Sequence, residues 1–134
     1  MPGPSNWPPA PAEGANRRRA LLSGRRAEGA AALFLQLKGY RILARRFCVN
    51  GGEIDLITRK FDAIVFVEVK IRPTLIEAML SIDARKRRRM SRAANVWLAA
   101  NPWAARLTLR GDAIYLAPWR LPRHVIAALP LDIG

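Results

Sequence analysis

The most restrictive feature of this sequence is a pair of apolar segments that contain charged residues. The segments cover residues 51–57 and 64–70, and a short polar break separates them. Runs of Ile, Val, Leu and Phe on either side of such a break indicate a β-hairpin. Their charged members are Glu53, Asp55, Glu68 and Lys70. Because a buried charge is costly unless it is paired or bound to a metal, these residues indicate a site within the hairpin.

A four-residue hairpin loop, 59–62, predicts how the two strands pair. It places Leu56 opposite Val65 and Glu53 opposite Glu68. Because side chains alternate with a period of two, the charged residues would then share one face of the hairpin. Asp55 and Glu68 would be diagonal neighbours, roughly 7–8 Å apart at the backbone. One Mg²⁺, which binds oxygen at about 2.1 Å, could reach both carboxylates.

The composition limits the class of protein. The chain has 134 residues, of which 51% are hydrophobic, which is sufficient for one domain with a core. The 23 Lys and Arg residues outnumber 10 acids and give a net charge of +13, so polyanions are expected partners. A single Cys48 excludes an internal disulfide and fits a reducing, cytoplasmic location. No apolar run is long enough to span a membrane.

Two amphipathic helices are predicted on either side of the hairpin in the chain. The first covers residues 23–38 and ends at Gly39, a favourable residue just beyond a helix. Glu28 falls on its apolar stripe and is expected to face the protein. The second helix begins at the N-cap Asp83 and ends before Pro102. Its apolar stripe consists of Met90, Ala93, Ala94, Trp97 and Leu98.

The remaining elements complete an αβββαβ order, which predicts an α/β fold with a mixed sheet. A first strand is expected at 41–45, followed by a loop. A later strand, 107–116, is expected to be interrupted at Gly111, and a terminal strand or short helix is expected at 123–129. Residues 1–20, rich in Pro, Gly and Ala, are expected to be a disordered leader without a secretory signal pattern. Residues 21–134 would form a single domain.

Four motifs occur in order along the chain, at residues 24–28, 39–43, 52–57 and 65–72. Together with the basic second helix they resemble the YraN family of small bacterial endonuclease-like proteins, over roughly residues 22–129. That family is similar to the PD-(D/E)XK nucleases, as archaeal Holliday-junction resolvases and many restriction enzymes are. The resemblance implies a three-layer, restriction-endonuclease-like core in which helices flank a mixed β-sheet.

The resemblance also implies a role for each charged residue. Asp55 would be the first metal ligand, Glu68 and Lys70 the acidic-x-lysine pair, and Glu28 the helix acid that completes the site. The backbone carbonyl of Val69 offers a further oxygen ligand for Mg²⁺ or Mn²⁺. Because acids surround Lys70 and favour its charged form, we expect it to orient the attacking water and stabilise the transition state.

The sequence departs from the family pattern at two places. Arg110-Gly111-Asp112 stands where the family usually has Arg-Phe-Asp, so we expect a looser strand there. Arg45-Arg46-Phe47 stands where Asn-x-Arg is usual, which removes whatever hydrogen bonds the Asn would make.

Several residues have a second interpretation. A Glu-x-Lys pair is also common as a solvated ion pair on a half-exposed strand. Glu28 could instead pair with an arginine of its helix. Glu53 is expected to cap the turn or pair with an arginine rather than bind metal. Asp112 is expected to be structural, and the lone His124 receives no functional role.

Basic side chains are predicted to hold a nucleic-acid backbone without reading base sequence. These residues are Lys86, Arg88, Arg89, Arg92, Arg25 and Arg26. DNA is favoured over RNA, and no membrane partner is expected. Many nucleases of this kind act as homodimers, although no residue here identifies a dimer face.

Three functions remain open from the sequence. The first is a metal-dependent endonuclease that hydrolyses DNA phosphodiester bonds. The second is a non-catalytic DNA- or RNA-binding module that retains the nuclease fold. The third is an interaction protein whose basic face binds an acidic partner or ribosomal RNA. Asp55, Glu68 and Lys70 favour the first, because a pure binder gains nothing from buried acids that repel phosphate.

Overall fold

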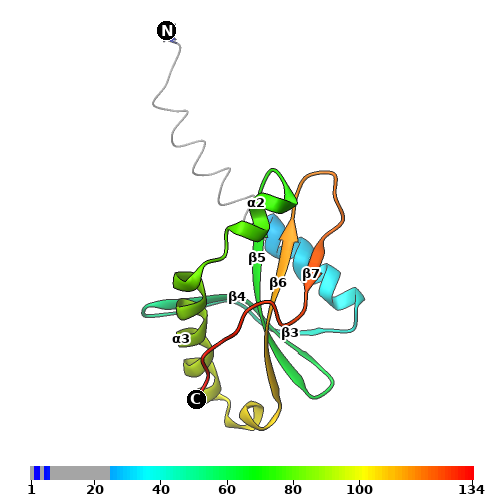
Figure 1. Cartoon of the computed structure of the whole chain (residues 1–134), viewed down its shortest axis with the longest axis vertical. Helices are drawn as coiled ribbons and strands as arrows, with labels where there is room; N and C mark the ends of the chain where they lie inside the picture. The colour runs from blue at the N-terminus through cyan, green and yellow to red at the C-terminus, as the bar shows by residue number, and fades with distance from the viewer. Residues whose placement is uncertain (1, 4, 7–24) are drawn as a thin grey trace.

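A mixed β-sheet runs through the centre of the molecule (Figure 1). The computed structural model describes residues 2, 3, 5, 6 and 25–134, and within them five strands form this sheet in the order β3-β4-β5-β6-β7. β5 and β6 are parallel, and the other neighbours are antiparallel. The strands are β3 (Arg41–Val49), β4 (Gly52–Lys60), β5 (Ala63–Ile71), β6 (Thr108–Leu116) and β7 (Arg123–Val125).

Helices cover both faces of the sheet, so the expected three-layer α/β arrangement is confirmed. The first helix, described over residues 25–37, packs on one face and α3 (Ala84–Ala100) on the other. The connection from β5 to β6 contains α2 (Leu75–Leu80), α3 and the 3₁₀ helix η1 (Pro102–Arg106). Within the described residues, no helix is both long and apolar enough to cross a membrane.

Alternate residues of the central strands supply two apolar cores. Ile64 and Phe66 of β5 pack towards α3, while Val65 and Val67 pack towards the first helix. The period of two in a strand produces this division. Both faces of β5 are therefore buried, which explains its nearly continuous apolar sequence.

The hairpin between β4 and β5 has a different register from the predicted one. Lys60 pairs with Ala63 and Leu56 with Val67, so the predicted Leu56–Val65 pair and the four-residue loop are wrong. The loop contains only two residues, and the first of them, Phe61, has a φ of 54°. Tight hairpins need positive φ, which Gly, Asn or Asp usually supply, so the sequence carried no clear signal for this turn.

An error of two residues in the register does not by itself change the face on which a side chain lies. The observed loop has two residues fewer than the predicted one, and side chains two residues apart in a regular strand lie on the same face. The regular pairing of β4 with β5 ends at Leu56 and Val67, so it includes neither Asp55 nor Glu68. Ile54 packs towards α3 whereas Leu56 packs towards the first helix, so the alternation of β4 is broken between them. Asp55 still lies next to this part of β5, because its carboxylate accepts a hydrogen bond from the backbone amide of Val69 at 2.8 Å.

The end of the first helix is confirmed. Gly39 has a φ of 93°, and the amides of Gly39 and Tyr40 donate to the carbonyls of Gln36 and Leu35 at 3.0 Å. This pair of bonds is a Schellman motif, which glycine favours because it adopts positive φ without strain. The predicted start at Ser23 lies outside the described residues. So does most of the predicted leader 1–20, apart from β1 (Pro2–Gly3) and β2 (Ser5–Asn6).

The first strand is longer than predicted. β3 continues through the expected loop as far as Val49, with an irregularity between Ile42 and Ala44 and a positive φ of 50° at Arg46. The local sequence does not predict that the strand continues beyond residue 45, because the continuation is stabilised by pairing with β4.

The second helix agrees with its prediction. Asp83 is the N-cap, and its carboxylate accepts a hydrogen bond from the Lys86 amide at 3.0 Å. The short helices α2 and η1 were not predicted. Residues 123–129 were expected to form either a strand or a short helix. They form the short strand β7, followed by an irregular segment.

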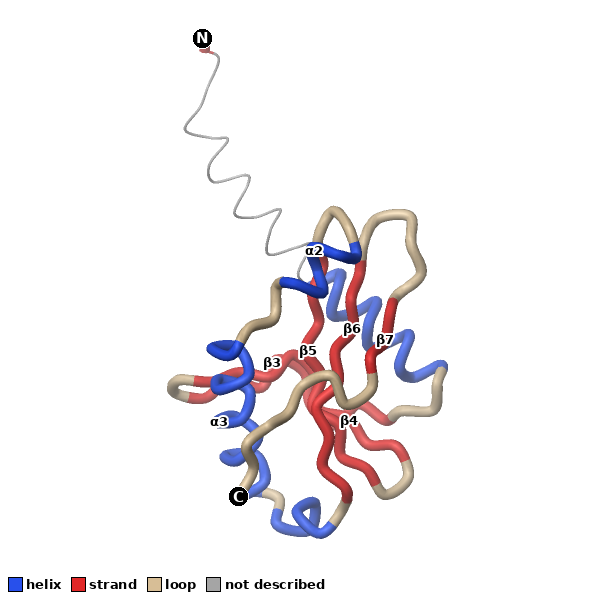
Figure 2. Tube along the Cα trace, viewed as in Figure 1, coloured by secondary structure: helices blue, strands red, loops and turns tan. Residues whose placement is uncertain are grey.

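The predicted interruption of the fourth long strand is wrong. β6 runs without a break through Gly111, whose carbonyl accepts a hydrogen bond from the Leu129 amide at 3.0 Å. After β7 the chain returns across the sheet to α3 (Figure 2). A side chain at position 111 would bring its Cβ to 2.5 Å from the Leu129 carbonyl oxygen. Glycine therefore permits this crossing, and Leu129 and Leu131 of the crossing chain fill the space beside it.

Candidate functional site

Two carboxylates lie together on the central strands. Asp55 of β4 accepts a hydrogen bond from the backbone amide of Val69 through Oδ2, at 2.8 Å. Burial, followed by the charge of the neighbouring Glu68 on β5, raises the pKa of Asp55 to about 7. Like charges held close in a site of low polarity have this effect. The structure thus brings Asp55 and Glu68 into one electrostatically coupled pair.

Glu68 is more deeply buried than Asp55. Its side chain is 1% exposed, and neither carboxylate oxygen accepts a hydrogen bond from the described residues. The ammonium groups of Lys70 and Lys86 lie 3.4 and 3.2 Å from Oε1. A buried carboxylate without hydrogen bonds is costly, so these cations are its principal compensation.

Lys86 enters the site from the first turn of α3. Its ammonium lies 3.3 Å from Oε1 of Glu53 as well as 3.2 Å from Glu68. Burial alone would lower the pKa of Lys86, but the charges of Glu68, Asp55 and Glu53 outweigh burial and raise it. The structure therefore places Lys86 among the acids, which differs from the phosphate contact expected of it.

Glu28 approaches the same site from the first helix. Glu28, Arg46, Cys48, Glu53, Ile54 and Asp55 line a hollow of about 230 Å³. The Glu28 carboxylate accepts a hydrogen bond from Nε of Arg46 at 2.5 Å. Its partner is therefore a strand arginine rather than an arginine of its own helix. Arg46 belongs to the segment that departs from the family pattern.

The carboxylate pair is suited to a hard divalent cation. Mg²⁺ binds oxygen, commonly through one or two protein carboxylates, and keeps several waters. Both Glu68 oxygens lack hydrogen bonds, while the Val69 amide orients Asp55 through one oxygen. Asp55 and Glu68 thus fit Mg²⁺ or Mn²⁺. Among the described residues no group of three or more His, Cys, Asp or Glu side chains is close enough to hold a metal, so Glu28 does not complete a three-acid cluster.

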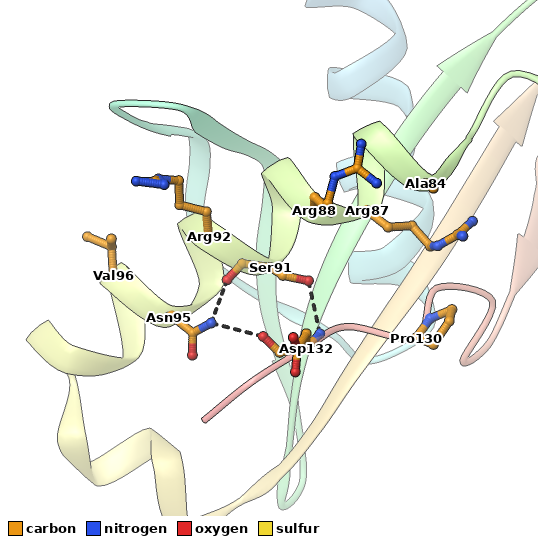
Figure 3. A pocket seen from close by; sticks show the side chains of 9 residues that line it. All are labelled: Ala84, Arg87, Arg88, Ser91, Arg92, Asn95, Val96, Pro130 and Asp132. Carbon is orange, nitrogen blue, oxygen red and sulfur yellow. Dashed lines mark hydrogen bonds between the residues drawn. The ribbon is translucent and has the colours of Figure 1, made fainter.

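The outer side of α3 carries several arginines. Arg87, Arg88 and Arg92 help to line a hollow of about 600 Å³ between α3 and the C-terminal segment (Figure 3). Ser91 and Asn95 hold that segment through the backbone of Asp132, at 2.9 Å each.

The arginines predicted to contact nucleic acid lie on α3 and at the beginning of the described part of the first helix. Arg92 donates through Nε to the carbonyl of Asn50 at 3.1 Å, and Arg89 lies 3.9 Å from Glu53. Arg25 and Arg26 are exposed at the beginning of the described part of the first helix. The arginines do not converge on one point, and contact along a phosphate backbone does not require them to.

A second polar cluster lies on the other face of the sheet. Asp112 is fully buried and binds Arg110 at 2.8 Å and His124 at 2.7 Å. Burial would raise the pKa of Asp112, but the hydrogen bonds from His124, Arg110 and the Ala127 amide lower it. Lys38 contacts the opposite ring nitrogen of His124 at 2.6 Å. Sequence reasoning missed this role of His124, because the Lys38–His124 contact joins residues 86 positions apart.

The fold and the acids define a small three-layer α/β protein with a coupled carboxylate pair on its central sheet. The chain belongs to the uncharacterised protein family UPF0102, whose model matches residues 27–116. This is the YraN family, so the resemblance in the sequence is confirmed at the level of family membership.

Relatives in several bacteria support this assignment. A UPF0102 protein of Methylocella silvestris is 59% identical over 119 residues, covering 89% of this chain and 96% of that protein. One of Methylobacterium nodulans is also 59% identical over 119 residues, covering 88% and 92%. One of Mesorhizobium japonicum is 50% identical over 111 residues, covering 83% and 89%.

Proposed function

We propose that this protein is a metal-dependent endonuclease that hydrolyses phosphodiester bonds in DNA in the cytoplasm. The observation that carries the proposal is the buried carboxylate of Glu68, which has no hydrogen bond from the described residues and lies beside Asp55. Such an arrangement is costly for a protein that only binds polyanions, since acids repel phosphate. The resemblance to PD-(D/E)XK nucleases and the charge of +13 support the same function.

Each residue of the pair and its neighbours has a chemical task in this proposal. A bound Mg²⁺ would supply a hydroxide nucleophile at neutral pH and neutralise phosphate charge. Asp55 and Glu68 hold the cation, and the Val69 amide keeps the Asp55 carboxylate in place. Lys70 orients the attacking water and stabilises negative charge as it develops. Arg88 and Arg92 hold the phosphate backbone.

The second candidate is a nucleic-acid-binding module that does not cleave. The ion pair between Glu28 and Arg46 favours it, because it engages the acid that would complete the site. In this case the protein would bind DNA but a divalent cation would not lead to cleavage.

A cleavage assay separates these candidates. The full chain is incubated with linear, nicked and four-way-junction DNA in the presence of Mg²⁺ or Mn²⁺. We expect cation-dependent cleavage that Lys70→Ala reduces at least about 100-fold, because the lost charge stabilises the transition state. Lys60→Ala is the matched control, since Lys60 lies in β4 over the Tyr40 ring and away from the acids.

Two outcomes contradict the nuclease proposal. Cleavage that persists in both Lys70→Ala and Asp55→Asn would identify a contaminant or another site. Tight DNA binding without cleavage by the intact protein would support the binding module instead.

A further inference from the structure

The position of Lys86 requires an explanation beyond binding of phosphate. Its ammonium lies 3.2 Å from Glu68 and 3.3 Å from Glu53, and its side chain is only 19% exposed. The preceding residue, Arg85, is exposed on the same helix turn. Two adjacent cations of α3 thus face different surroundings, and of these two only Lys86 contacts Glu68 and Glu53.

The charge of Lys86 compensates for an otherwise costly arrangement. Asp55 and Glu68 carry like charges in a buried site, and Glu68 has no hydrogen bond from the described residues. Lys70 and Lys86 are the two cations of the described chain that contact Glu68. A divalent cation between the carboxylates would supply the same compensation, so it and the Lys86 ammonium would compete for Glu68.

We propose that Lys86 is a tethered cation that holds the carboxylate pair together in the metal-free protein and withdraws when a divalent cation binds. The inference rests on the metal site of the proposed function. It adds that the Lys86 ammonium competes with the divalent cation for Glu68. Withdrawal is sterically simple, because lysine has a flexible four-carbon stem. A released Lys86 would then be free for the phosphate contact that the sequence predicts.

Removal of this competitor should strengthen metal binding. Isothermal titration of Mn²⁺ into the full chain at pH 8 compares the intact protein with Lys86→Gln. We expect Lys86→Gln to bind Mn²⁺ at least about fivefold more tightly, the lower end of usual coupling between sites. Arg85→Gln removes the same charge one residue away and measures the general electrostatic effect. Lys86→Arg retains the charge and should bind Mn²⁺ as the intact protein does.

Thermal unfolding gives a second readout that does not depend on activity. In EDTA, Lys86→Gln should melt at a lower temperature than Arg85→Gln, because Glu68 loses a partner. With saturating Mn²⁺ this deficit should shrink, because the bound cation replaces the lost charge. A purely structural Lys86 would cause the same deficit in both conditions. If Lys86→Gln does not fold, Lys86→Met preserves packing of the stem and is measured in its place.

The outcomes distinguish this inference from the proposed function. Mn²⁺ binding by the intact protein that Asp55→Asn abolishes supports the metal site. If that site is present but Lys86→Gln binds Mn²⁺ equally or more weakly, the competitor role is overturned alone. If neither the intact protein nor Lys86→Gln binds Mn²⁺, both ideas fail.

Discussion

Asp55 is a residue whose ionised form lowers the stability of the fold. Burial and the nearby Glu68 raise its pKa to about 7, whereas an exposed aspartate titrates near 3.8. The folded protein therefore holds the Asp55 proton more tightly than the unfolded chain does. The stability from this proton is complete below about pH 4 and is lost as the pH rises through about 7.

Substitution of Asp55 should reveal this cost. In EDTA at pH 8, Asp55→Asn is expected to be more stable than the intact protein, by on the order of 2 kcal/mol, because no charge is buried there and the repulsion by Glu68 is gone. The advantage should disappear towards pH 4. Urea unfolding at several pH values measures it, with Asp132→Asn, an exposed acid, as the control. An unchanged or lower stability of Asp55→Asn at pH 8 would contradict the coupled pair.

Two glycines determine how closely the elements approach one another. A Cβ at Gly52 of β4 would lie 2.4 Å from the Arg89 carbonyl oxygen in α3, and one at Gly111 of β6 would lie 2.5 Å from that of Leu129. Such distances are well inside van der Waals contact. The first approach keeps the beginning of α3, and with it Lys86, near the acids. The second allows the C-terminal segment to cross the sheet.

Gly111→Ala tests the second approach. We expect it to destabilise the protein by about 1–3 kcal/mol, because backbone must move to admit the methyl group. Gly29→Ala is the matched control, since it lies in the first helix and, apart from the local backbone, no atom lies within 4 Å of the place its methyl group would take. That change should stabilise by about 0.5–1 kcal/mol through helix propensity. Equal effects in thermal or urea unfolding would contradict the close crossing.

The whole molecule combines an acidic interior site with a strongly basic exterior. The net charge of +13 attracts polyanions from any direction, whereas Arg88 and Arg92 are concentrated on one side of α3. If only the net charge attracts DNA, removing any two arginines should have the same effect. If Arg88 and Arg92 contact DNA directly, removing these two should have a larger effect. The salt dependence of DNA binding separates the two, because each phosphate contact adds to its slope.

Arg88 and Arg92 should contribute specifically to DNA binding. Replacing both with Gln is expected to weaken binding of all sequences and to reduce the salt slope by about 2. Arg41 and Arg45, exposed on β3, form a control pair with the same change of charge. Fluorescence anisotropy at several salt concentrations measures the affinity for DNA and the slope of its salt dependence. An equal loss in the two pairs would show that only net charge matters.

Much of the fold was predictable because its signals are local. The helix end at Gly39 depends on bonds from Gly39 and Tyr40 to the last helical turn, and Asp83 begins a helix through a bond to Lys86. Strand alternation likewise acts within a few residues, so the paired segments 56–60 and 63–67 were recognisable as strands although the predicted register was wrong by two. The turn at Phe61 and the crossing at Gly111 escaped prediction because tertiary packing stabilises them.

The sequence by itself determined the order of the long helices and strands and the basic charge, since these depend on composition and on neighbours along the chain. Only the tertiary structure decided which cations compensate the acids. Lys86 is 33 residues from Glu53, and Arg46 is 18 residues from Glu28. Contacts over such separations depend on how helices pack against the sheet, and no local pattern of residues encodes that packing.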